Sequence, residues 1–168
     1  MALGEVDISG GSYIDLAPAS PVPAGIEGFR HLAGMPTLQI APEDLAMVPD
    51  ILKGQIAVLA VKDGARVDAT GLQIPGVLDD LYTYDGELGV SWKGGIPTIR
   101  VWAPTAKSAT FHLFDDSDPA TSSTPMPMTL DDATGVWSIK GNGSWKNKFY
   151  LYEVEVYVHA TGKVEHNL

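Results

Sequence analysis

The chain has 168 residues and no cysteine, and its 21 acidic and 11 basic side chains give it a formal charge of −10. This composition excludes a disulfide scaffold and thiolate chemistry, and such an acidic balance disfavours nucleic acid and anionic membranes as partners. The longest stretches without a charged side chain, residues 31–42 and 119–130, contain proline and are too short to span a bilayer.

The first 53 residues predict mostly irregular structure, because glycine and proline interrupt the runs that could become regular elements. We expect one isolated strand over residues 13–16. A short helix is expected over residues 42–52, since Pro42 suits the first turn and Pro49 limits the length.

A hairpin is predicted next. Two extended runs, residues 55–62 and 66–70, flank the pair Asp63-Gly64, and Asp-Gly between such runs is a strong hairpin signal. Residues 71–85 then form an expected connector with a second short helix over residues 77–82.

The second half predicts closely spaced strands. They are expected at residues 88–93, 98–102, 107–114, 126–130, 136–140, 148–158 and 163–166. Seven short strands separated by turn signals are typical of a β-sandwich, so the chain is expected to be mainly β.

Alternating side chains assign the faces of these strands. In residues 148–158 every second residue is apolar, while Glu153 and Glu155 occupy the opposite face. The predicted core positions are Tyr150, Tyr152, Val154, Val156 and Val158, with Ala109, Phe111, Leu113, Ile99 and Val101 on neighbouring strands.

No catalytic or metal-binding constellation is visible in the sequence. The four histidines lie far apart without ligand spacing, so each is expected at the surface or hydrogen-bonded in the core. The pairs Asp115-Asp116 and Asp131-Asp132 lie in expected turns, where capping is a better explanation than glycosidase chemistry. Ser122-Ser123 lacks a nucleophile elbow, and no phosphate-binding glycine loop is present. We therefore expect no catalytic residue, no metal and no cofactor.

Aromatic side chains suggest a different activity. A sugar ring presents an apolar face ringed by hydroxyl groups, so it is held by a flat aromatic face with polar side chains at the edge. Trp145 follows a Gly-Asn-Gly-Ser loop, and Lys146 and Asn147 supply hydrogen-bond donors beside it. These three residues form the predicted carbohydrate site. A structural role for Trp145 is the alternative, and it is the favoured interpretation for Trp102 and Trp137, which lie within strands.

Several segments in one order resemble the non-catalytic N-terminal region of pullulanase-type starch-debranching enzymes, which include the limit dextrinases. They are residues 71–80 (GLQIPGVLDD), 81–85, 88–90, 97–116 (PTIRVWAPTAKSATFHLFDD), 135–139 (GVWSI), 145–156 (WKNKFYLYEVEV) and 161–168 (TGKVEHNL). The likeness covers roughly residues 52–168, and ordered segments are more specific than a lone motif.

This resemblance implies that residues 85–168 are a carbohydrate-binding module of family 48, with an immunoglobulin-like β-sandwich fold. It also implies that residues 1–84 are a partial N-terminal domain, mostly irregular and β, with a connector. It implies a segment without catalytic residues, taken from a family 13 glycoside hydrolase that cleaves α-1,6 linkages in pullulan, branched starch or glycogen fragments. The implied partners are α-glucan and the catalytic barrel of the same parent chain. A purely structural interdomain sandwich without sugar affinity is the alternative. A protein-binding immunoglobulin-like domain is a third interpretation, which depends on the fold alone.

Overall fold

The computed structural model describes residues 11–19, 30–118 and 120–168, and the chain forms two compact units, Met1–Val48 and Pro49–Leu168. In the first unit, β1 (Leu16–Pro18) pairs antiparallel with β2 (Leu38–Ile40), so that Leu16 lies opposite Ile40. The prediction of an isolated strand over residues 13–16 is therefore wrong, because the strand begins at Leu16 and has a partner. The short 3-10 helices η2 (Arg30–Leu32) and η3 (Pro42–Met47) complete the described part of this unit.

The helix expected over residues 42–52 forms as two consecutive pieces, η3 and the single-turn α1 (Val48–Ile51). The predicted hairpin is confirmed as β3 (Ala57–Lys62) and β4 (Ala65–Gly71). Its turn places Asp63 at φ 53° and Gly64 at φ 75°, the left-handed geometry that two-residue hairpin turns require. The short helix α2 (Pro75–Leu81) then leads toward the sandwich.

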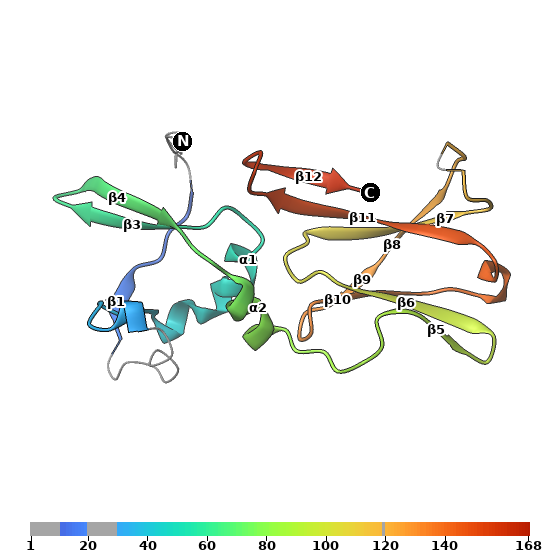
Figure 1. Cartoon of the computed structure of the whole chain (residues 1–168), viewed down its shortest axis with the longest axis horizontal. Coiled ribbons are helices and arrows are strands. Elements are labelled where there is room, and N and C mark those ends of the chain that lie inside the picture. Colours follow the sequence, from blue (N-terminus) through green and yellow to red (C-terminus); the bar gives the residue numbers. More distant parts are fainter. Residues whose placement is uncertain (1–10, 20–29, 119) are drawn as a thin grey trace. The chain divides into compact units, whose positions relative to one another are not determined.

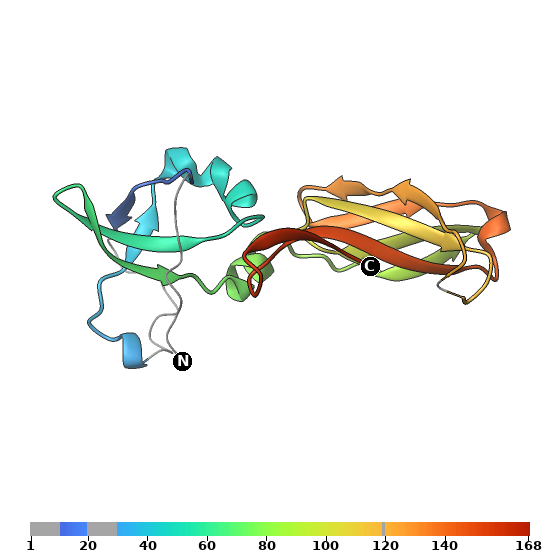
Figure 2. The same cartoon turned by 90° about the horizontal axis from the view of Figure 1, so that it is seen from above.

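The remaining residues form two four-stranded antiparallel sheets, which confirms the predicted β-sandwich. One sheet has the order β5-β6-β10-β9 and the other the order β12-β11-β7-β8. The strands are β5 (Gly89–Lys93), β6 (Ile96–Trp102), β7 (Ser108–Phe114), β8 (Thr124–Pro127), β9 (Thr129–Asp131), β10 (Val136–Lys140), β11 (Phe149–Val158) and β12 (Lys163–Asn167). Figure 1 shows the sheets as two layers, and Figure 2 looks onto the layer that contains β11 and β12, drawn in red.

The core lies between these layers. Ile99 and Phe111 are each 1% exposed, and Trp137 packs with them in the same cluster. Tyr152 and Val154 lie opposite Phe111 and Ala109 in the β11–β7 register and pack against the core, as alternation predicted. Tyr150 and Val158, also predicted as core positions, lie outside the core cluster: Tyr150 stacks on Phe111 but is 36% exposed, because it lies near the end of the strand. The fold thus follows from apolar side chains at every second position of each strand.

One expected strand, residues 126–130, is two strands in the structure. β8 pairs with β7 in one sheet and β9 pairs with β10 in the other, and the chain crosses between the sheets at Met128. Met128 is buried, and its backbone N–H donates to the carbonyl of Ala109 at 2.9 Å. This crossing raises the number of strands in the sandwich from the predicted seven to eight.

Two tryptophans anchor loops at one end of the sandwich through their indole N–H groups. Trp137 donates to the Ala103 carbonyl at 3.0 Å. Trp102 donates to the carbonyls of Tyr82 and Thr134 at 3.1 and 3.0 Å. The structural role predicted for these two residues agrees with these bonds. Among the residues that the structure describes, no helix has the length and apolar character needed to cross a membrane.

Candidate functional site

The predicted carbohydrate site lies in the connection between β10 and β11. This connection contains the 3-10 turn η4 (Gly143–Trp145), and the Asn142 side chain caps it by accepting a hydrogen bond from the Ser144 backbone N–H at 2.9 Å. The carbonyl of Asn142 also accepts a bond from the backbone N–H of Trp145 at 3.1 Å. The loop thus has a defined backbone, although no strand pairs with it.

Trp145 is half-buried and points toward the core. Its ring stacks on Phe111 with centroids 5.1 Å apart and an interplanar angle of 13°. Gly141 lies so close to the indole that a Cβ added there would be 2.2 Å from the Trp145 Cε3 atom. The indole is therefore held in place by Phe111 and Gly141, and it anchors the loop to the core.

Lys146 and Asn147 are both exposed, directly after this anchor. Asn147 has φ 62°, a left-handed conformation that asparagine adopts more readily than most residues. Lys148 is engaged elsewhere, because its ammonium pairs with the Asp115 carboxylate at 2.5 Å. No ion pair within the described ranges involves Lys146, so the loop presents a lysine and an amide to solvent.

A further aromatic side chain, Trp92, lies near the same end of the sandwich. Trp92 is 48% exposed on the edge strand β5, and only Lys93 separates it from the turn Gly94-Gly95. A Cβ added at Gly143 would lie 3.6 Å from the Gly95 carbonyl oxygen, so this turn is adjacent to η4. Trp92 was not among the predicted site residues, although a tryptophan close to a Gly-Gly turn at the end of a predicted strand is a signal for an exposed ring.

The outer face of the other sheet carries a hydrogen-bonded chain of polar side chains. His112 contacts the Ser123 hydroxyl through Nδ1 and the Glu153 carboxylate through Nε2, both at 2.8 Å. Glu153 also accepts a bond from His166 Nδ1 at 3.0 Å. These contacts, above all the hydrogen bond from His112, lower the pKa of Glu153 below its usual range. No group of residues in the described part of the chain has the arrangement of a metal site.

Two buried side-chain oxygens in the described part of the chain lack a hydrogen-bond partner, the hydroxyls of Thr134 and Tyr152. The Tyr152 hydroxyl forms no hydrogen bond, and burial, followed by the influence of Tyr150, raises the pKa of Tyr152. This hydroxyl is enclosed within the aromatic cluster of the sandwich, where Tyr152 meets the Phe111 ring edge-on. It is therefore a feature of the core and no candidate for acid–base chemistry at the surface.

Comparison with protein families divides the chain into two matched stretches. Residues 2–80 match the pullulanase N2 domain, and residues 87–166 match carbohydrate-binding module 48, the isoamylase N-terminal domain. Neither is the catalytic part of a pullulanase, which confirms the prediction that this segment comes from the non-catalytic N-terminal region.

Relatives with curated names are pullulanases. Pullulanase 1, chloroplastic, from Arabidopsis thaliana is 36% identical over 151 residues, which are 89% of this chain and 15% of that protein. The pullulanase of Klebsiella pneumoniae is 34% identical over 157 residues, which are 91% of this chain and 14% of that protein. The chain thus spans only a small part of the length of these relatives.

Solved structures share the fold. The pullulanase of Klebsiella pneumoniae complexed with maltotriose superposes with a TM-score of 0.82 at 31% identity, over 94% of this chain and 15% of that chain. PulA from Klebsiella oxytoca gives a TM-score of 0.80 at 32% identity, over 93% of this chain and 15% of that chain.

Proposed function

Because the chain belongs to the pullulanase family and consists of its N2 domain followed by a carbohydrate-binding module 48 domain, we propose that it binds α-glucan and braces a catalytic barrel. The parent enzyme would be an α-1,6-glucosidase acting on pullulan, branched starch or glycogen fragments. The proposed contact residues for glucan are Lys146 and Asn147, with the half-buried Trp145 as the residue that positions them.

The observation that carries this proposal is the anchored loop. Stacking of Trp145 on Phe111 fixes the backbone that presents Lys146 and Asn147, so these donors need little ordering when a ligand binds. An ammonium and an amide can each donate to sugar hydroxyl groups. A site of this kind, with few contacts, is consistent with millimolar affinity, about −4 kcal/mol.

The bracing role is supported by apolar side chains on the surface of the sandwich. Phe149 and Leu151 are 49% and 41% exposed, and both point outward because Leu151 lies opposite the outward-facing His112. Neighbouring exposed apolar side chains often mark an interface. The alternative function, a structural sandwich without sugar affinity, is favoured by this same observation, so the two are separated by binding measurements.

Isothermal titration with a branched maltooligosaccharide or β-cyclodextrin tests the proposal. The variant Lys146→Ala/Asn147→Gly removes both donors while glycine retains the left-handed backbone at position 147. We expect at least a several-fold loss of affinity in this variant and none in Lys163→Ala, a matched exposed lysine on β12. If the native chain releases no binding heat and migrates unretarded in amylopectin gels, the structural alternative holds.

A further inference from the structure

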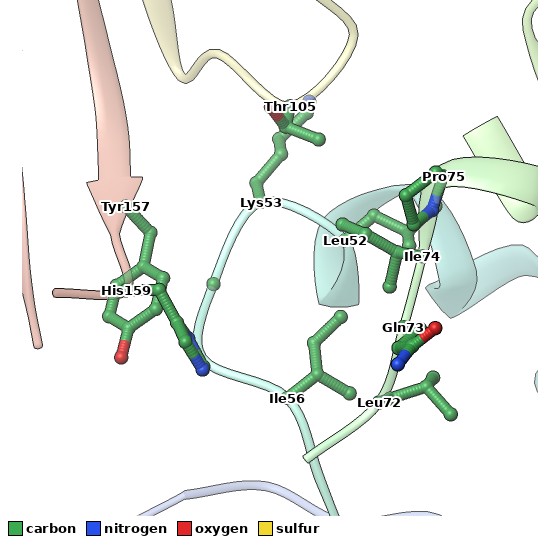
Figure 3. Close-up of a pocket in the computed structure, with 11 residues that line it drawn as sticks. Leu52, Lys53, Ile56, Leu72, Gln73, Ile74, Pro75, Thr105, Tyr157 and His159 are labelled. Atoms are coloured by element: carbon green, nitrogen blue, oxygen red, sulfur yellow. The ribbon is translucent and has the colours of Figure 1, made fainter.

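A pocket with a volume of about 350 Å³ opens in the second unit, away from the η4 loop. Its lining comes from the chain before β3, the chain between β4 and α2, the turn after β6 and the end of β11. The lining residues are Leu52, Lys53, Gly54, Ile56, Leu72, Gln73, Ile74, Pro75, Thr105, Tyr157 and His159. Figure 3 shows Tyr157 and His159 on one side and Gln73 to Pro75 on the other, with Ile56 between them. This volume lies within the usual range of small-ligand sites, roughly 300–1,000 Å³.

The walls combine an aromatic surface with separate polar groups. Tyr157 is half-buried, and its ring meets the His159 imidazole edge-on, with centroids 6.1 Å apart and an interplanar angle of 75°. This contact orients both rings on one wall of the pocket. Gln73 and Thr105 supply an amide and a hydroxyl, which can donate and accept hydrogen bonds.

The charges around the pocket narrow the choice of ligand. The chain contains 21 acidic residues, yet none of them lines this pocket, so no carboxylate is present there to attract a cation. Lys53 is the permanently charged group of the lining. Its ammonium lies 3.8 Å from the Asp50 carboxylate, which neutralises part of its charge. A neutral molecule with an apolar face and several hydroxyl groups fits this lining best.

We propose that this pocket is a second saccharide site, which binds a terminal glucosyl unit of an α-glucan chain. The choice of an α-glucan as the ligand rests on the proposed function, whereas the pocket itself is separate from the η4 loop. The sugar ring lies against Tyr157, and its hydroxyl groups bond to Gln73 and His159. Two separate contacts on one segment would hold a branched glucan more firmly than either alone, because the second contact forms intramolecularly.

The test is NMR titration of the 168-residue chain with maltotriose, following the ring signals of His159 and the backbone signals of Lys146 and Asn147. We expect saturable shifts at His159. Tyr157→Leu should weaken binding at the pocket about three- to tenfold, the effect of losing one aromatic contact. The matched control is Tyr13→Leu, since Tyr13 is 86% exposed and lies in the other unit. Gln73→Ala, a change at an exposed residue, serves if Tyr157→Leu fails to fold.

Two outcomes separate this inference from the proposed function. If maltotriose shifts the signals of Lys146 and Asn147 but leaves His159 unchanged, the pocket is not a saccharide site and the proposed function stands. If His159 responds and the loop does not, the pocket is the site and the loop assignment fails. Equal responses to maltotriose and to a β-linked trisaccharide, unaffected by Tyr157→Leu and by Gln73→Ala, would overturn the pocket proposal as well.

Discussion

The indole of Trp145 lies nearly parallel to the Phe111 ring, and this contact joins the β10–β11 loop to the centre of the sandwich. Phe111 is 1% exposed and stacks also on Tyr150, with centroids 5.3 Å apart. The core aromatic cluster therefore extends to the loop that carries the proposed glucan contacts. Stability of the core and geometry of the loop should depend on each other.

Gly141 tests this dependence directly. A methyl group at this position would lie 2.2 to 2.6 Å from three indole atoms of Trp145, so Gly141→Ala must displace either the ring or the backbone. We expect a loss of about 1–3 kcal/mol in the free energy of unfolding, typical of overpacking. Urea denaturation measures it. Gly143→Ala is the matched control, since its Cβ would meet only the Gly95 carbonyl oxygen at 3.6 Å. Equal losses in the two variants would contradict the contact.

Truncation of Phe111 should be far more damaging than truncation of an exposed phenylalanine. Phe111→Ala removes a fully buried ring from between Trp145 and Tyr150, and such changes cost about 3–5 kcal/mol. Phe149→Ala, at a ring that is 49% exposed, should change the free energy of unfolding by less than about 1 kcal/mol. Tryptophan emission should shift to longer wavelength in Phe111→Ala as water reaches Trp145. An unchanged spectrum would show that the indole is held by other contacts.

The sandwich could be predicted from the sequence because its signals are local. Alternation along β11 and the Asp63-Gly64 turn depend on neighbouring residues alone, and both predictions are confirmed. The crossing at Met128 was missed, because residues 126–130 alternate as one strand does and only the pairing partners reveal two sheets. The β1–β2 pair was missed for the same reason, since its two short strands lie far apart in the sequence.

The candidate site was only partly accessible to sequence reasoning. The sequence around Trp145, Lys146 and Asn147 identified the loop, but it did not decide whether the tryptophan contacts sugar or has a structural role. The stacking partner Phe111 lies on another strand, so no neighbouring residue signals the burial of the indole. The pocket is still less visible, because its lining comes from four separate segments and contains no motif. Long-range packing decides both cases.

The hydrogen bonds of Glu153 should make the stability of the fold depend on pH in the acidic range. Its hydrogen bonds from His112 and His166 favour the carboxylate and lower the pKa of Glu153 in the folded chain below the usual 4.5. A depressed pKa stabilises the fold above the unfolded value, and this contribution is lost as the pH falls through the folded value. We expect Glu153→Gln to show a smaller drop in melting temperature between pH 5.5 and pH 3 than the native chain. Glu165→Gln, a carboxylate on β12, is the control for the change in net charge. Identical acid sensitivity in all three chains would remove Glu153 as the cause.

The buried hydroxyl of Tyr152 should lower the stability of the fold at neutral pH and lower it further at high pH. Its buried hydroxyl has no hydrogen-bond partner, and leaving such a group unpaired costs about 1–3 kcal/mol in the native state. Tyr152→Phe keeps the ring against Phe111 and removes that cost, so the free energy of unfolding at pH 7 should rise by about 1 kcal/mol. Burial raises the pKa of Tyr152 above the usual 10.0, so the native chain should lose stability as the pH rises past that value, because only the unfolded state ionises readily. Urea denaturation at pH 7 and pH 11 should therefore show a larger difference for the native chain than for Tyr152→Phe. Tyr13→Phe, at a tyrosine that is 86% exposed and lies in the other unit, should behave like the native chain in both respects. A loss of stability in Tyr152→Phe at pH 7 would mean that the hydroxyl is hydrogen-bonded in solution.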